Sequence, residues 1–96
     1  MEAVSFLANL YLQIGSYNKA IMFYESTLAS FRKSDNSLGL LRSTTGIGIA
    51  QMNLTNYDTA SMQFHKALKL AVERGHKTAQ GLILNNLGRL HKRKGE

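Results

Sequence analysis

The chain has 96 residues, of which 44% are hydrophobic, and it contains neither cysteine nor proline. Its length limits it to one domain, and its apolar content is that of a folded globular protein rather than of a disordered chain. The lack of cysteine excludes a disulfide framework and a thiolate metal site. No apolar run approaches the roughly 20 residues that span a bilayer, and no signal peptide is visible. The sequence therefore predicts a cytoplasmic protein, with the nucleus as an alternative compartment.

The net charge of +6 is unevenly distributed along the chain. Residues 1–58 carry equal numbers of basic and acidic side chains, so the whole excess of positive charge lies in residues 59–96. Such an asymmetry favours an acidic partner at the carboxyl-terminal end. The alternative is a solvated helix end, where cations complement the helix dipole.

Apolar residues at intervals of three and four predict helices throughout the chain. In the first helix Val4, Leu7 and Tyr11 share one stripe, and the turn at Gly15 ends it, because glycine adopts the left-handed conformation that closes a helix. Four further helices are expected at about residues 18–33, 38–53, 58–74 and 77–93. The polar segment 34–37 offers good N-cap residues for the third of the five.

Two copies of one pattern, forty residues apart, organise these helices, and a half copy follows at the same spacing. The positions of the first copy are Leu7, Ala8, Tyr11, Gly15, Tyr17, Ala20, Tyr24 and Leu28. Their counterparts are Ile47, Gly48, Gln51, Thr55, Tyr57, Ala60, Phe64 and Leu68, and the half copy comprises Leu87, Gly88, His91 and Gly95. Such a period predicts a solenoid whose units bury their apolar faces against one another. We expect close contacts between small residues, Ala8 with Ala20 and Gly48 with Ala60, with Tyr24 and Phe64 beside them.

These segments resemble the tetratricopeptide repeat, most specifically at residues 7–11, 15–20, 56–60 and 86–88. The forty-residue spacing is similar to that of the long variant in polarity and spindle-orientation adaptors and in kinesin light chains. The resemblance implies an all-α solenoid of antiparallel helix pairs, with about five helices in a right-handed superhelix. Residues 1–96 then form a single array, with repeat 1 at about 1–36, repeat 2 at about 37–76 and the first helix of repeat 3 at about 77–96. Thr55 stands where the family has a turn glycine.

The resemblance also implies a function, because the first helix of each such unit lines a concave groove that binds an extended or helical peptide. The implied groove residues are Ser5, Asn9, Leu12, Gln13, Arg42, Thr45, Ile49, Met52, Asn53, Leu82, Asn85, Asn86, Arg89, Lys92 and Arg93. Asparagine amides can pair with a peptide backbone, and Arg89 and Arg93, one turn apart, can bind a carboxylate in a bidentate manner. The sequence therefore predicts a protein-interaction scaffold for a partly acidic peptide.

No constellation of residues for catalysis, for a cofactor or for a metal is visible. The three histidines stand 11 and 15 residues apart without cysteine beside them, so we expect solvent-facing side chains. The segment 46–48 has the form GxG but lies inside a helix, unlike a phosphate-binding loop. The six carboxylates are scattered, and no nucleophile is paired with a base. We expect a protein that is not an enzyme, uses no cofactor and has neither a small-molecule substrate nor a membrane partner.

Binding of nucleic acid is a minor alternative, suggested by the basic cluster at residues 91–94. Against it, no aromatic residue is interleaved in the last helix to stack on bases.

Apolar residues at the two ends of the chain suggest a second alternative. The first helix has a second apolar side, made by Ala3, Phe6, Leu10 and Ile14. A helix that is apolar nearly all round is normally buried between others. Leu84 and Gly88 of the last helix would likewise pack against a further helix. The chain is then a structural segment of a longer repeat array, or a module that associates with itself through these ends.

Overall fold

The computed structural model describes residues 2–95; residues 1 and 96 of the expected array, and the side chains of Glu2 and Ala3, lie outside the described part. Five α-helices follow one another: α1 (Glu2–Gln13), α2 (Tyr17–Lys33), α3 (Ser37–Asn53), α4 (Tyr57–Glu73) and α5 (Lys77–Arg93). No strand occurs between residues 2 and 95. The expected all-helical class and the five helices are therefore confirmed, with every expected helix end within one residue of the observed one.

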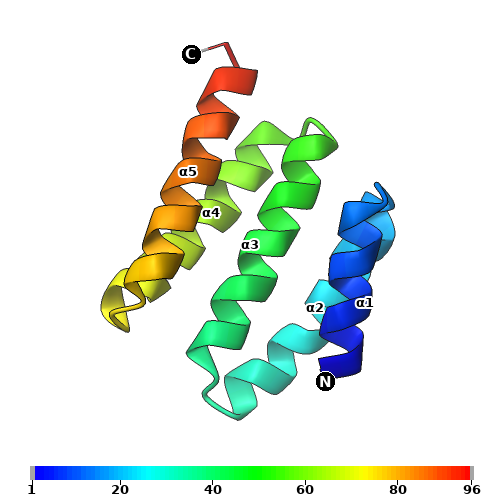
Figure 1. The fold of residues 1–96 in the computed structure, drawn as a ribbon, viewed down its shortest axis with the longest axis vertical. Coiled ribbons are helices and arrows are strands. Elements are labelled where there is room, and N and C mark those ends of the chain that lie inside the picture. Colours follow the sequence, from blue (N-terminus) through cyan, green and yellow to red (C-terminus); the bar gives the residue numbers. More distant parts are fainter. Residues whose placement is uncertain (1, 96) are drawn as a thin grey trace.

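The helices form two layers, in which consecutive helices pack against each other. Figure 1 shows α1, α3 and α5 side by side in the nearer layer, with α2 and α4 behind them. α3 is the central helix, since it contacts all four others. The molecule measures 38 × 30 × 18 Å along its principal axes. α1 and α5 lie at opposite sides of the nearer layer (Figure 1). Within residues 2–95, α1 contacts only α2 and α3, and α5 contacts only α3 and α4.

All four connections between the helices are built in the same way. Each leaves three residues between helices, and the middle residue has a positive φ: Gly15 (85°), Asp35 (52°), Thr55 (66°) and Gly75 (71°). The next amide donates to a carbonyl five residues earlier, as Ser16 N does to Tyr11 O at 2.9 Å. These are Schellman turns, which satisfy the last carbonyls of a helix. In the polar segment 34–37, which was expected to supply an N-cap, Asn36 Oδ1 accepts a hydrogen bond from Gly39 N at 2.9 Å and so caps α3.

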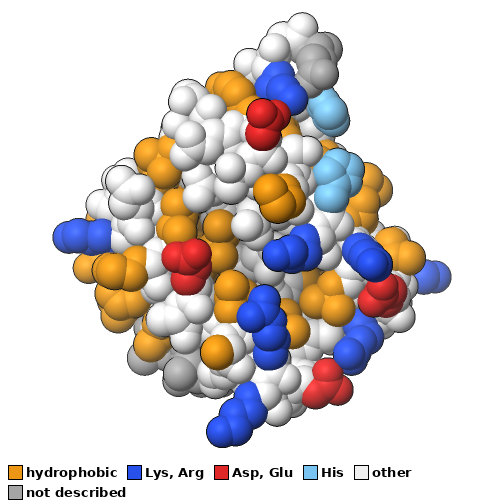
Figure 2. Space-filling view, turned by 180° about the vertical axis from the view of Figure 1, so that it is seen from behind, with side chains coloured by type: hydrophobic (Ala, Val, Ile, Leu, Met, Phe, Trp, Pro, Cys, Tyr) orange, Lys and Arg blue, Asp and Glu red, His pale blue; other side chains and the backbone are white. Residues whose placement is uncertain are grey.

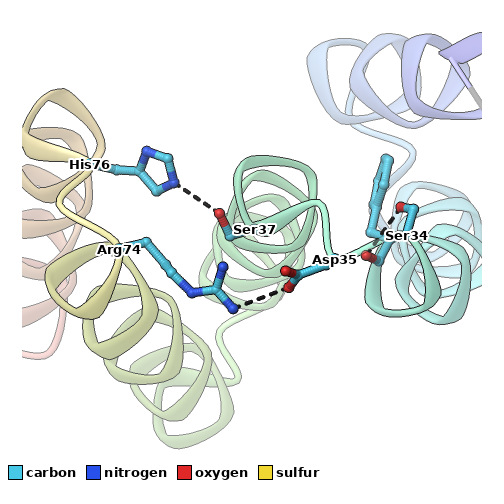
Figure 3. A network of polar contacts seen from close by, with 6 residues as sticks. Ser34, Asp35, Ser37, Arg74 and His76 are labelled. Carbon is cyan, nitrogen blue, oxygen red and sulfur yellow. Dashed lines mark hydrogen bonds and ion pairs between the residues drawn. The ribbon is translucent and has the colours of Figure 1, made fainter.

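Two equivalent turns of successive repeats are joined by side chains. Arg74 Nη2 donates to Asp35 Oδ1 at 3.1 Å, and Ser37 Oγ lies 3.0 Å from His76 Nε2 (Figure 3). In both pairs the partners are 39 residues apart, so the contacts follow the period of the sequence. The ion pair is largely exposed, and such pairs contribute about 1 kcal/mol or less. The packing of the helices must therefore supply most of the stability.

The buried side chains form two clusters on either side of α3. The first cluster comprises Ala8, Ala20, Tyr24 and Ile47. The second comprises Leu41, Met52, Ala60, Phe64, Ala67, Ala71, Ile83, Leu87 and Leu90. The small residues Ala8, Ala20 and Ala60 are 0% exposed, as their place in the repeat predicts.

Aromatic rings lie against the backbone of α3 where it carries glycine. A Cβ atom added at Gly46 would overlap the ring of Tyr24, and one added at Gly48 would lie 2.7 Å from the ring of Phe64. Gly48 was expected to face Ala60, and the atoms nearest to its Cβ position belong instead to the ring of Phe64. Because glycine has no side chain at these two positions, α2 and α4 can approach α3 closely.

Replacing these glycines by alanine should destabilise the fold. Alanine gains about 1 kcal/mol in helix propensity, but overpacking against a ring costs about 1–3 kcal/mol and should outweigh it in Gly46→Ala and Gly48→Ala. The matched controls are Gly81→Ala and Gly88→Ala in α5, where a Cβ would meet nothing within 4 Å. They should raise the free energy of unfolding by about 1 kcal/mol each, as measured by urea denaturation. Equal effects at all four positions would contradict the role of the rings.

Thr55 offers a position at which the chain can be stabilised. It is β-branched and holds a φ of 66°, a conformation that costs a residue with a side chain roughly 1–2 kcal/mol. We expect Thr55→Gly to raise the free energy of unfolding by about 1 kcal/mol and the melting temperature by about 4–8 °C. Thr55→Ala is the control, since it removes the branched side chain but keeps the unfavourable φ. A similar rise in both variants would show that the backbone conformation is not the cause.

Candidate functional site

A groove of about 660 Å³ opens among α1, α3 and the first half of α5, with its floor on α2. Its apolar lining consists of Phe6, Leu12, Tyr24, Phe31, Leu38, Leu41, Ile49, Ala79, Leu82 and Ile83. The polar lining consists of Ser5, Asn9, Asn36, Arg42, Ser43, Thr45 and Thr78, and Gly39 and Gly46 complete it. The groove is therefore mainly apolar, as ligand sites usually are, with a few polar groups at its walls.

The floor of the groove exists because α3 carries glycine at two positions on one face. Gly39 and Gly46 are seven residues apart, as are Tyr24 and Phe31 on the antiparallel α2. A Cβ atom at Gly39 would lie 2.6 Å from the ring of Phe31, so both rings rest on the α3 backbone. Phe31 is not among the groove residues expected from the sequence. The seven-residue spacing of these glycines opposite two aromatic residues was the signal that could have identified it.

The polar groups of the groove differ in whether they have a partner. The hydroxyl of Tyr24 donates to Asn9 Oδ1, and burial raises the pKa of Tyr24 to about 12. Thr45 Oγ1 donates to the Leu41 carbonyl at 2.6 Å. The hydroxyl oxygen of Ser5 is buried and has no hydrogen-bond partner within the described part of the chain.

Arg42 is the one charged side chain among the described residues that line the groove. It is exposed, and within residues 2–95 it takes part in no ion pair. A cation beside apolar surface attracts a carboxylate, and the guanidinium can hold it with two parallel hydrogen bonds. The groove thus offers a few donors and one positive charge at the edge of an apolar surface.

Seven of the fifteen expected groove residues line this groove: Ser5, Asn9, Leu12, Arg42, Thr45, Ile49 and Leu82. The other eight lie outside it: Gln13, Met52, Asn53, Asn85, Asn86, Arg89, Lys92 and Arg93. Met52 is only 1% exposed and packs in the cluster around Phe64, so its side chain belongs to the core. Asn86 is 8% exposed, and its Nδ2 donates to the Leu82 carbonyl at 3.1 Å.

The basic side chains near the end of α5 are partly engaged with α3 and α4. Arg93 Nη1 donates to Asn53 Oδ1 at 2.9 Å, and Lys94 Nζ lies 3.7 Å from Asp58 Oδ1. Arg89 is exposed and lies outside the lining of the groove. The expected apolar middle and the expected basic end therefore do not line the same groove, because the groove ends in the first half of α5.

The opposite face of the molecule has a mixed character. Figure 2 shows Lys and Arg side chains interspersed with hydrophobic and acidic ones on that side. Met22 and Met62, which are equivalent positions of the two repeats, are 57% and 59% exposed.

Among the described residues, no group of three or more His, Asp or Glu side chains could hold a metal ion. None of the helices in this part of the chain has the length and apolar character needed to cross a membrane.

Comparisons of the chain with protein-family models, with curated proteins and with solved structures find no match. What the structure establishes is an all-helical protein in which five helices pack against their neighbours and a mainly apolar groove opens on one face.

The raised pKa of Tyr24 predicts a pH dependence at alkaline pH. Burial favours the neutral form of the Tyr24 phenol in the folded state. The contribution of this neutral phenol to the free energy of unfolding is therefore complete below the ordinary pKa of 10.0, and it is lost as the pH rises towards 12. Over this interval the free energy of unfolding should fall further for the parent chain than for Tyr24→Phe. Below pH 9 or so, Tyr24→Phe should be less stable by about 1 kcal/mol, because it lacks the hydrogen bond to Asn9.

Thermal unfolding followed by circular dichroism between pH 8 and pH 12 measures both effects. A difference between the two chains that stays constant over the whole range would show that the phenol does not titrate as a buried group. Absorbance of the tyrosinate gives an independent measurement, since Tyr24→Phe should remove the fraction that ionises last.

Proposed function

We propose that the chain is a tetratricopeptide-type α-solenoid module that binds an extended or helical peptide in the groove among α1, α3 and α5. The forty-residue pattern, the five helices and the four equivalent turns support this architecture. In such a scaffold the groove binds a partner and performs no chemistry, and the residues of this groove offer no pairing of a nucleophile with a base.

The observation that carries the proposal is an apolar groove with a single cation, Arg42, at its wall. Apolar side chains of a peptide would occupy the space above Phe31, Ile49 and Leu82. An Asp, Glu or carboxyl-terminal group would bind Arg42. The acidic half expected for the ligand is thus assigned to Arg42 rather than to Arg89 and Arg93, which lie outside the groove.

Two further polar groups support a peptide as the ligand. Asn9 uses its carbonyl oxygen to accept from Tyr24, which leaves the Nδ2 amide as a donor. The buried hydroxyl of Ser5 has no hydrogen-bond partner among residues 2–95, and a buried polar group without a hydrogen bond costs about 1–3 kcal/mol. A peptide backbone supplies acceptors and donors for both groups.

The alternative function is that of a structural segment that contacts further helices or copies through its flanks. The observation in its favour is the exposure of large apolar side chains on the flanks of the helix layer, including Ile14 at 64% and Leu84 at 55%. Peptide binding and contacts at the flanks use different surfaces, so variants in the groove separate the two.

The test is a selection of peptides from a random library on the purified chain, followed by affinity measurement on three variants. Selected peptides should be enriched in apolar residues and contain a carboxylate. Arg42→Glu should weaken their binding at least about tenfold, since it replaces an attractive charge by a repulsive one. Arg32→Glu is the matched control, because it makes the same change of charge at an exposed position of α2 outside the groove.

Arg89→Glu is the third variant and tests the expected basic end. A large effect there with none at Arg42 would assign the acidic contact to the end of α5 instead. If no peptide is selected, or if all three variants bind like the parent, the groove is not the binding site and the structural alternative is favoured. Circular dichroism checks that each variant is folded.

A further inference from the structure

One side of α1 carries a stripe of exposed apolar side chains, of which Phe6 also lines the groove while Leu7, Leu10 and Ile14 lie outside it. Phe6 and Leu10 are four residues apart and so share one side of α1, with Leu7 beside them. Ile14, in the turn after the helix, continues the same spacing, and its amide donates to the Leu10 carbonyl at 3.0 Å. The exposed fractions of Phe6, Leu7, Leu10 and Ile14 are 69%, 38%, 42% and 64%. A contiguous exposed patch of this kind in a small protein usually marks an interaction site.

The positions of α3 that are equivalent to this stripe of α1 are covered by another helix. The α3 residues forty positions after Phe6 and Leu10 are Gly46 and Ala50, and both are buried. Gly46 lies under the ring of Tyr24 from α2, which runs antiparallel to α3. On α1 the equivalent positions carry large apolar side chains, and none of the described helices packs against them. The repeat therefore places a helix against a flank that α1 leaves open.

We propose that the α1 stripe pairs with the α1 stripe of a second copy of this chain, antiparallel and about a two-fold axis near Leu10. In a two-fold interface the same patch serves both partners, so each copy buries Phe6, Leu7, Leu10 and Ile14 against the same set. Leu10 lies midway between Phe6 and Ile14, which places it close to its own symmetry mate in an antiparallel pair.

The distribution of charge favours this partner. No charged side chain occurs between residues 4 and 18, so two copies of α1 can meet without placing like charges together. The excess positive charge lies in residues 59–96, and α5 is at the far side of the layer from α1 (Figure 1). Pairing through α1 keeps the two basic ends apart, whereas pairing through α5 would bring them together at a cost in repulsion.

The apolar side chains favour the same partner over a head-to-tail contact. The exposed flank of α5 offers Leu84, at 55% exposure, between two glycines with open space around them, Gly81 and Gly88. Pairing α1 with α1 therefore removes more apolar surface from water than pairing α1 with α5. A helix of 12 residues is only about 18 Å long, so the interface is small and the dimer is weak and dependent on concentration.

Sedimentation equilibrium of the full chain over a wide range of concentration tests the proposal. The parent chain should fit a monomer–dimer equilibrium. Leu10→Lys places two cations at the axis and should raise the dissociation constant of the dimer on the order of 100-fold. Met62→Lys is the matched control: it adds the same charge at a 59% exposed position of α4 and should leave the dissociation constant unchanged. Circular dichroism confirms that both variants keep their helices.

Cross-linking tests the geometry, because the chain has no cysteine of its own. Leu10→Cys should form a disulfide-linked dimer under mild oxidation, since a two-fold axis beside it brings the two Cα atoms within the roughly 4.4–6.8 Å that a disulfide needs. Met62→Cys should not. A parent chain that stays monomeric at millimolar concentration would overturn the proposal. So would assemblies larger than a dimer, or cross-linking of Leu10→Cys to Leu84→Cys in preference to itself, since these indicate a head-to-tail contact.

Discussion

The rings of Tyr24 and Phe64 rest on the backbone of α3 at Gly46 and Gly48, and this close approach sets the distances between the helices. Because α3 contacts all other helices, its glycine positions control both clusters of the core. The same kind of contact, in which the ring of Phe31 lies against the backbone at Gly39, forms the floor of the groove. Stability and the candidate site therefore depend on one kind of contact, in which an aromatic ring takes the place that a side chain of α3 would occupy.

The turns impose a second regularity on this packing. A left-handed residue recurs every 20 residues, so the helix–turn unit is half as long as the sequence repeat of forty. These residues are Gly15, Asp35, Thr55, Gly75 and, after α5, Gly95, which has a φ of 84°; Asp35 and Thr55 hold the conformation with a side chain. Asp35 also pairs with Arg74 one repeat later, so a position that is unfavourable for the backbone contributes a contact between the repeats.

The groove and the apolar flank of α1 are adjacent but distinct surfaces. Phe6 belongs to both, since it lines the groove and begins the exposed stripe. A peptide above Ile49 and Leu82 would not cover Leu10 or Ile14, which lie outside the lining of the groove. Peptide binding and pairing with a second copy would therefore share Phe6 and no other residue of the groove lining.

The sequence by itself determined the helices, because the apolar periodicity, the turn glycines and the forty-residue repeat are local or periodic signals. The residues that its resemblance to the tetratricopeptide repeat implies include seven of the nineteen that line the groove, among them Asn9, Arg42 and Leu82. Only the tertiary structure decided that Met52 is buried, that the groove ends in the first half of α5 and that Phe31 of α2 forms its floor. The physical reason is that burial and the extent of a groove depend on how closely neighbouring helices approach. That distance is set by glycine and aromatic residues on different helices, which no single helical pattern reveals.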